Sequence, residues 1–213
     1  MDAATREIPW LDSWRVVVPV KDARVGKSRL AASMTDADEH LRRAIADDTL
    51  RAVVAAVGVG QTIVVTSDPE LAPRWAEAGV TVVPDPATGL NGAVTAGLQV
   101  AAGEGRLLAA LLGDLPALLP EDLLAALEAA MAADQSFVPG RAGSGTVLRC
   151  GPMFVPRFGH RSAQAHAADG ATRLALDLPR LRTDVDDRES LADAVLLGLG
   201  SCTHSALARP GLG

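Results

Sequence analysis

The chain has 213 residues, a formal net charge of −6, and a composition that is 48% hydrophobic and 22% charged. This length and balance suit one globular domain with a full core and give no reason to expect a second. The negative charge excludes a broad basic surface for a nucleic-acid backbone, so no nucleic-acid partner is expected. Any phosphate that the protein binds must therefore be held by a local site.

The termini and the cysteines indicate the compartment. Cys150 and Cys202 show no metal-ligand spacing, and two cysteines are too few for a disulfide scaffold. The first residues lack a basic segment followed by an apolar run, and no apolar stretch approaches the ~20 residues that cross a bilayer. We expect a cytoplasmic protein with no membrane partner. Its oligomeric state is open, with a homodimer as one alternative.

Strand-like and helix-like segments alternate along the chain. Short β-branched or apolar runs predict strands at 14–20, 62–66, 80–83, 106–112, 136–139, 146–150 and 180–185. Apolar residues at helical spacing, with caps and an initial proline, predict helices at 36–57, 69–79, 90–102, 120–133, 160–170 and 188–197. Residues from 198 onward are expected to be frayed, as is the N-terminus.

This alternation predicts an α/β protein with one Rossmann-like domain, a mostly parallel mixed sheet covered by helices on both faces. The domain would span residues 1–213, with its core between about 14 and 197. Such sheets bind ligands beyond the carboxyl ends of their strands. Three segments end strands there: the loop that contains Lys21, the Gly113-Asp114 pair, and the acidic residues at 184–187. We expect the chemistry where these three segments meet.

Lysine is confined to one loop. Of the 20 basic residues only two are lysine, Lys21 and Lys27, and both follow the first strand. A compact ammonium acts as a point charge at phosphate sites, although a coding bias toward arginine is the plain alternative. Gly26-Lys27-Ser28 resembles the end of a P-loop, but Lys21 stands where that motif needs its first glycine. A P-loop ATPase or kinase is therefore only a runner-up.

Two carboxylates at strand ends are candidate metal ligands. Asp114 follows the apolar run at 106–112, and Asp186 lies in the acidic cluster. A carboxylate in such a place is expensive to desolvate unless it is paired or binds a cation, and its alternative role is to cap a helix or turn. If the two converge, they form a hard-oxygen site for Mg²⁺ that phosphate oxygens must complete.

Two glycine-rich turns and a pair of histidines carry weaker signals. The segments 143–146 and 158–162 offer backbone N–H groups and hydroxyls, the parts of an anion-binding nest, although such segments are more often plain turns. His160 and His166 are six residues apart, which gives no metal-binding pair on one helix. Both histidines are expected to be solvated.

Together these pieces resemble one family. The matching segments, in chain order, are 18–30, 89–93, 113–116, 145–146, 158–162 and 184–186. This set is similar to the 2-phospho-L-lactate guanylyltransferases and their phosphoenolpyruvate guanylyltransferase relatives, which serve biosynthesis of the deazaflavin coenzyme factor 420. The resemblance implies a nucleotidyltransferase fold of the molybdenum-cofactor guanylyltransferase type, with GTP as donor and pyrophosphate as the product released.

The resemblance also implies roles for individual residues by motif match. Lys21 and Lys27 would hold the triphosphate, Asn91 would lie near the guanine or ribose, Asp114 and Asp186 would bind Mg²⁺, and Thr146, Gly159 and Ser162 would grip phosphoenolpyruvate. Lys27, Asp114 and Asp186 would carry the catalysis. An acceptor phosphate is already an anionic nucleophile, so positive charge and positioning would do most of the work.

The sequence leaves the acceptor open among phosphoenolpyruvate, 2-phospho-L-lactate and phosphoglycerate. The arginine- and alanine-rich composition favours phosphoenolpyruvate, because it is typical of the actinobacterial branch of the family. A cytidylyl- or sugar-phosphate nucleotidyltransferase is the main alternative enzyme. A nucleotide-binding sensor domain is the non-enzyme alternative, and it would keep the lysine loop without needing both carboxylates.

Overall fold

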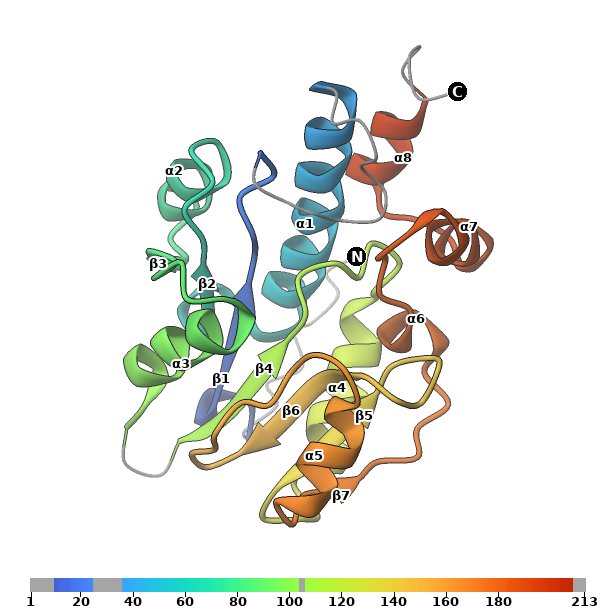
Figure 1. Cartoon of the computed structure of the whole chain (residues 1–213). Coiled ribbons are helices and arrows are strands. Elements are labelled where there is room, and N and C mark those ends of the chain that lie inside the picture. Colours follow the sequence, from blue (N-terminus) through green and yellow to red (C-terminus); the bar gives the residue numbers. More distant parts are fainter. Residues whose placement is uncertain (1–9, 25–35, 104–105, 209–213) are drawn as a thin grey trace, which may run out of the picture.

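The computed structural model describes residues 10–24, 36–103 and 106–208 (Figure 1). A seven-stranded sheet forms its centre, in the order β3-β2-β1-β4-β6-β5-β7. The strands are β1 (Trp14–Pro19), β2 (Thr62–Val65), β3 (Thr81–Val83), β4 (Leu107–Leu111), β5 (Ser136–Pro139), β6 (Thr146–Gly151) and β7 (Thr172–Arg173). Strand β6 runs antiparallel to β4 and β5, and the other described pairings are parallel. The predicted mostly parallel, mixed sheet is confirmed.

Helices connect the strands. They are α1 (Asp36–Val57), α2 (Leu71–Glu77), α3 (Leu90–Ala101), α4 (Pro120–Ala130), α5 (Ser162–Ala168), α6 (Pro179–Arg182), α7 (Arg188–Leu197) and α8 (Ser201–Leu207), with short 3-10 turns at Leu11–Ser13 and Val59–Gln61. Helix α1 has the predicted limits, and it ends where Gly58 adopts a φ of 86°, a conformation that glycine allows. None of the described helices is both long and apolar enough to cross a membrane.

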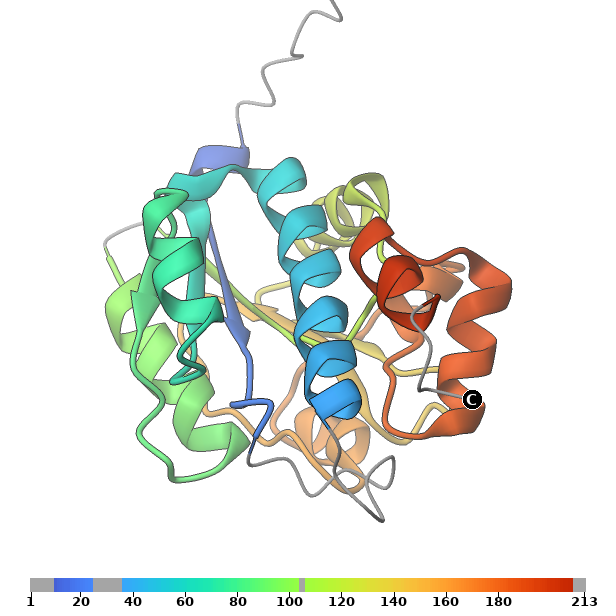
Figure 2. The same ribbon diagram turned by 90° about the horizontal axis from the view of Figure 1, so that it is seen from above.

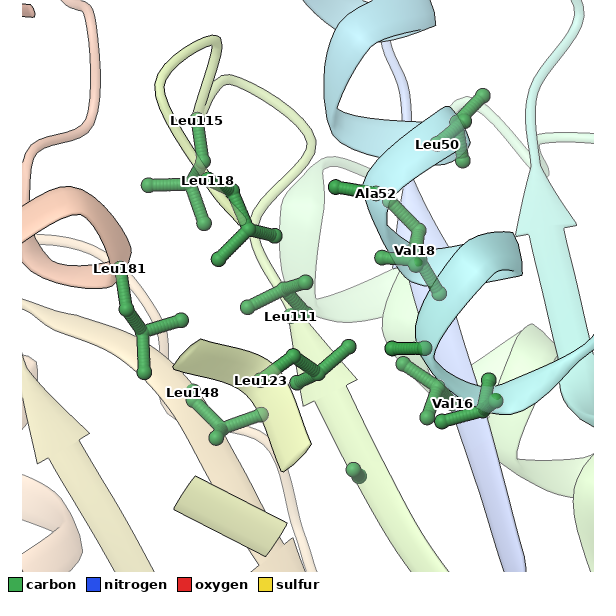
Figure 3. Close-up of a cluster of buried hydrophobic side chains, with 14 of the residues drawn as sticks. Val16, Val18, Leu50, Ala52, Leu111, Leu115, Leu118, Leu123, Leu148 and Leu181 are labelled. Atoms are coloured by element: carbon green, nitrogen blue, oxygen red, sulfur yellow. The ribbon is translucent and has the colours of Figure 1, made fainter. Parts of the chain in front are cut away.

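Alternating side chains of β1 divide the core into two layers. Val16 and Val18 point to one face, where they pack with Leu50 of α1 in a cluster that also holds α2 and α4 side chains (Figure 3). Val17 points to the other face and packs with Val94 of α3. Helix α5 also lies on this second face, against β5. The sheet is therefore buried on both sides, as its continuous apolar strands require.

The strand predicted at 180–185 is wrong. Pro179 starts the four-residue helix α6 there, because proline fits the first turn of a helix. Leu181, Thr183 and Val185 are all buried, so an alternating burial pattern exists without strand pairing. The edge of the sheet is instead formed by the two-residue β7, which is too short to produce a periodic signal.

The expectation of a frayed chain from residue 198 is also wrong over α8. This helix packs against α1 (Figure 2). The Asp48 carboxylate accepts hydrogen bonds from the backbone N–H groups of Cys202 (3.0 Å) and Thr203 (2.7 Å). A Cβ on Gly200 would lie 2.2 Å from Asp48 Cγ, so glycine is needed at this position. The helix is stabilised by a cap from a distant part of the sequence.

Candidate active site

A cleft of about 670 Å³ lies beyond the carboxyl ends of β1 and β4. Six of the predicted site residues line it: Lys21, Asp114, Thr146, Gly159, Ser162 and Asp186. Lys27 lies outside the described residues, and Asn91 follows the cleft residue Leu90 without lining the cleft itself. The expected meeting of the lysine loop, the Gly113-Asp114 pair and the acidic segment is therefore observed.

The lysine loop is held in place at Ala23. Its N–H donates to Asp68 Oδ2 (3.1 Å), and its carbonyl accepts a hydrogen bond from Arg42 Nη1 (2.6 Å). These two contacts fix the main chain two residues beyond Lys21, whose side chain lines the cleft. The loop is therefore positioned by two polar side chains that the sequence motifs did not single out.

Asp68 is fully buried behind this loop. It accepts hydrogen bonds from the N–H groups of Glu70 and Leu71, both at 3.0 Å, and pairs with Arg43 Nε at 3.0 Å. Burial alone would raise the pKa of Asp68, but the N–H donors of Leu71, Ala23 and Glu70, together with Arg43, hold it below its usual value. Asp68 is thus a charged anchor for the loop that contains Lys21.

We expect Asp68→Asn to weaken both the fold and GTP binding. The amide offers one acceptor oxygen in place of two, so a buried donor is left unpaired at a cost of about 1–3 kcal/mol. Because the pKa of Asp68 is lowered, its stabilising contribution is present at neutral pH and is lost as the pH falls through that pKa. Denaturant unfolding at neutral and acidic pH and GTP titration measure these effects.

Glu70→Gln is the matched control, because Glu70 is an exposed partner of the same Arg43. It should leave unfolding and GTP binding nearly unchanged. Unchanged GTP affinity in Asp68→Asn would contradict the role of Asp68 as an anchor for the loop.

Asp114 reaches the cleft because β4 ends in a close approach to β1. A Cβ on Gly113 would lie 2.7 Å from the carbonyl oxygen of Pro19, so only glycine fits there. The Oδ1 atom of Asp114 is buried and has no hydrogen-bond partner within the described part of the chain. Burial, followed by the negative charges of Asp184 and Asp186, raises the pKa of Asp114 to about 8.

The acidic segment is joined to Asp114 through the main chain. The N–H of Val185 donates to the carbonyl oxygen of Asp114 (3.0 Å), which sets Asp184 and Asp186 beside it. The capping alternative holds for Asp187, which forms a capping box with Ser190 at the start of α7. It does not hold for Asp114, whose Oδ1 caps nothing in the described structure.

These carboxylates fit a cation that arrives with a phosphorylated ligand. Their metal-binding atoms are all oxygens, which Mg²⁺ prefers. A buried carboxylate oxygen without a partner, such as Asp114 Oδ1, costs free energy unless a cation or a hydrogen-bond donor reaches it. No group of three or more His, Cys, Asp or Glu side chains that could hold a metal occurs in the described ranges. Asp114 and Asp186 would therefore need phosphate oxygens to complete a coordination shell.

A β-bulge turns Thr146 away from the core under α1 and α4 and toward α5. Val138 pairs with Leu148, but Pro139 pairs with Thr146, so β6 contains one extra residue at this point. Leu148 contributes to the core under α1 and α4, whereas Thr146 Oγ1 lies 3.0 Å from His166 Nδ1 of α5, on the opposite face. Without the bulge, Thr146 and Leu148 would point to the same face.

Ser162 lies at the start of α5 in an unusual turn. Its hydroxyl is buried and has no hydrogen-bond partner among the residues described, although the residue lines the cleft. Its N–H donates to the carbonyl oxygen of Gly159 (3.1 Å). Gly159 has a φ of 120°, and Arg161 has a φ of 56°, a left-handed conformation that is strained for a residue with a side chain. The turn therefore places a strained main chain and a buried hydroxyl without a described partner at the cleft.

Asn91 supports this turn from α3. Its Nδ2 donates to the carbonyl oxygen of Phe158 (3.0 Å), and its Oδ1 accepts from the N–H of Phe158 (2.7 Å). Both ends of the amide are thus occupied by main chain, and a contact with guanine or ribose stays a prediction. His160 is exposed, as expected, but the expectation of a solvated His166 is wrong, because that side chain is fully buried.

The fold and the cleft define a nucleotidyltransferase. Residues 24–180 match the model of the MobA-like NTP transferase domain, and the chain belongs to that family. Two relatives are named phosphoenolpyruvate guanylyltransferase. The protein of Salinispora arenicola is 49% identical over 197 residues, covering 89% of this chain and 91% of its own, and that of Geodermatophilus obscurus is 42% identical over 210 residues, covering 93% and 97%. The chain is thus a member of the guanylyltransferase family that its motifs resemble.

Solved structures agree on the fold. A nucleotidyl transferase from Methanothermobacter thermautotroptrophicus has a TM-score of 0.56 at 19% identity, covering 86% of this chain and 97% of its own. A cytidylyltransferase from Leptospira borgpetersenii has a TM-score of 0.56 at 10% identity, covering 92% and 91%. The predicted nucleotidyltransferase fold is confirmed.

Proposed function

We propose that the protein transfers the guanylyl group of GTP to phosphoenolpyruvate, releases pyrophosphate, and serves biosynthesis of the deazaflavin coenzyme factor 420 in the cytoplasm. The observation that carries the proposal is the composition of one cleft. It joins a lysine, a pair of carboxylates and two hydroxyls that come from five separate segments. The names of the relatives support phosphoenolpyruvate over 2-phospho-L-lactate as the acceptor.

The two sides of the cleft divide the substrates. The lysine loop on β1 would hold the triphosphate, because a compact ammonium suits a phosphate chain. Thr146, Ser162 and the turn at Gly159 would hold the acceptor, since they offer hydroxyl and backbone donors, and β4 separates the strand of Thr146 from β1 and its loop. The carboxylates Asp114 and Asp186 lie in the same cleft, where donor and acceptor phosphates would meet.

The reaction is a direct displacement. An oxygen of the acceptor phosphate attacks the α-phosphorus of GTP, one P–O bond forms, and the bond to the β-phosphate bridging oxygen breaks. The electron pair of that bond leaves on pyrophosphate, so no proton transfer is needed. Lys21 would stabilise the negative charge of the triphosphate. The scheme needs no nucleophilic serine or cysteine, because the acceptor phosphate is itself the nucleophile. Mg²⁺, held by Asp114 and Asp186, would supply positive charge at the phosphates.

Release of pyrophosphate tests this proposal. The pure protein is incubated with Mg²⁺, each of the four nucleoside triphosphates, and phosphoenolpyruvate, 2-phospho-L-lactate, a sugar phosphate or no acceptor. We expect pyrophosphate only with GTP and an acceptor, and fastest with phosphoenolpyruvate. Turnover with CTP or a sugar phosphate would favour the alternative enzymes. Nucleotide binding without turnover for any pair would favour the sensor domain. The pathway assignment is tested separately, by loss of the coenzyme from cells that lack the gene.

A further inference from the structure

His166 connects three parts of the acceptor side. It is fully buried, and its Nδ1 lies 3.0 Å from Thr146 Oγ1 on β6. Its Nε2 accepts a hydrogen bond from the backbone N–H of Arg157 (3.1 Å), in the segment that leads to the Gly159 turn. The rings of Phe137 and Phe158 pack against it. Both ring nitrogens of His166 have protein partners and the residue does not line the cleft, so it can act on a ligand only through a neighbour.

The two contacts determine where the protons lie. Because Nε2 accepts from a backbone N–H, it carries no proton, and the neutral ring must carry its proton on Nδ1. The Nδ1–H group then donates to Thr146 Oγ1. A hydroxyl that accepts at this position keeps its own hydrogen for a different partner. Thr146 lines the cleft, so this hydrogen is available to a ligand bound there.

The surroundings keep the ring neutral. The charged groups around it are Arg149 on β6, Arg157 in the preceding segment and Asp169 at the end of α5. Burial, followed by the positive charge of Arg149, lowers the pKa of His166 to about 4, against the opposing effect of Asp169. Folding therefore favours the neutral ring, and this stability is present above pH ~6.5 and is lost as the pH falls toward 4.

We propose that His166 is a positioning residue for the acceptor, because its Nδ1–H group occupies Thr146 Oγ1 and leaves the Thr146 hydroxyl hydrogen to bind an anionic oxygen in the cleft. The inference rests on the proposed function in one respect, namely that this side of the cleft holds the phosphorylated acid. It adds a hydrogen-bond direction: the threonine acts as a donor, as an anionic ligand requires.

Two substitutions separate orientation from packing. His166→Asn keeps an N–H group near the position of Nδ1 and should retain most of the acceptor affinity. His166→Asp places an acceptor there, which draws the Thr146 hydroxyl hydrogen away from the cleft. It should raise the KM for phosphoenolpyruvate by ~10–100-fold with little change in the KM for GTP. His204→Asn, at an exposed histidine of α8 outside the cleft, is the matched control and should change neither constant.

A double-mutant cycle tests whether the effect passes through the threonine. In a Thr146→Val background, His166→Asp should have almost no further effect on the KM for phosphoenolpyruvate, because the hydroxyl that it misdirects is gone. In a Ser162→Ala background it should retain its full effect. Additive effects in the Thr146→Val background, or equal loss of acceptor affinity in His166→Asn and His166→Asp, would overturn the proposal.

Histidine NMR of the parent protein tests the proton positions without substrate and without a variant that must fold. In protein labelled with ¹⁵N-histidine, the His166 resonances, assigned by their absence from His166→Asn, should show a protonated Nδ1 and an unprotonated Nε2 at pH 7. That pattern should persist down to about pH 5. An Nε2–H tautomer, or a charged ring at pH 7, would overturn the proposal even if the protein turns over phosphoenolpyruvate. If His166 shows the Nδ1–H tautomer but the protein does not turn over a phosphorylated acid, the proposed function is wrong and the assigned hydrogen-bond direction still holds.

Discussion

Asp114→Asn and Asp186→Asn should each reduce kcat by on the order of 10³-fold, because each removes one of the two carboxylates proposed to hold Mg²⁺. A bound metal contributes several kcal/mol to such a transition state, and each ~1.4 kcal/mol is tenfold in rate. The melting temperature of Asp114→Asn without metal should not fall, because the change removes a buried oxygen that has no described partner from a carboxyl group whose pKa is already raised to about 8. Steady-state kinetics and thermal unfolding in EDTA measure the two effects.

Asp187→Ala provides the contrast within the same acidic segment. Asp187 caps α7, so its loss should cost about 1 kcal/mol of folding stability. Titration of Mn²⁺ in the presence of GTP should show weaker metal binding in Asp114→Asn and Asp186→Asn. Full activity in either of these two variants would remove the metal assignment, and a lowered melting temperature with full activity would assign a structural role.

Thr146→Val and Ser162→Ala should each weaken binding of phosphoenolpyruvate by roughly 10–100-fold, which corresponds to about 1.5–3 kcal/mol for a hydrogen bond to a charged group. Both residues line the cleft, and the buried hydroxyl of Ser162 has no partner in the described structure. GTP affinity should be nearly unchanged, because the lysine loop lies on the other side of the cleft. Calorimetric titration of each substrate separately measures the split.

Thr62→Val is the matched control for these variants. Thr62 is a buried threonine of β2 that donates to the carbonyl oxygen of Gly58 and does not line the cleft. Its replacement should lower stability slightly and leave both affinities unchanged. If GTP binding collapsed in Thr146→Val while phosphoenolpyruvate bound normally, the division of the cleft into two sides would be wrong.

The sequence predicted most of the architecture because its signals are local. Apolar runs and helical spacing identified β1, β2, β4 and α1 within a few residues. The rule that ligands bind at the carboxyl ends of strands correctly predicted that Lys21 and Asp114 lie in one cleft. The alternation of Leu181, Thr183 and Val185 misled because a short helix followed by a loop buries the same positions as a strand.

What the sequence did not predict depends on contacts between distant segments. Asp68 holds Ala23, 45 residues earlier, and Asp48 caps a helix that begins more than 150 residues later. His166 could not be assigned because its partner Thr146 is turned toward it by a bulge that leaves no mark in the residue pattern. Such contacts follow from the assembled sheet, since only folding brings these side chains within hydrogen-bond distance.

Phosphorus NMR of the reaction mixture tests the central claim most directly. The protein is mixed with GTP, phosphoenolpyruvate and Mg²⁺, and the spectrum is followed as the GTP resonances decline. We predict two coupled resonances of a new diphosphate, in which the phosphoenolpyruvate phosphorus is joined to that of GMP, together with one equivalent of pyrophosphate. Formation of GDP and orthophosphate would contradict this account, because it would place the bond cleavage at the γ-phosphate, as in a P-loop ATPase or kinase.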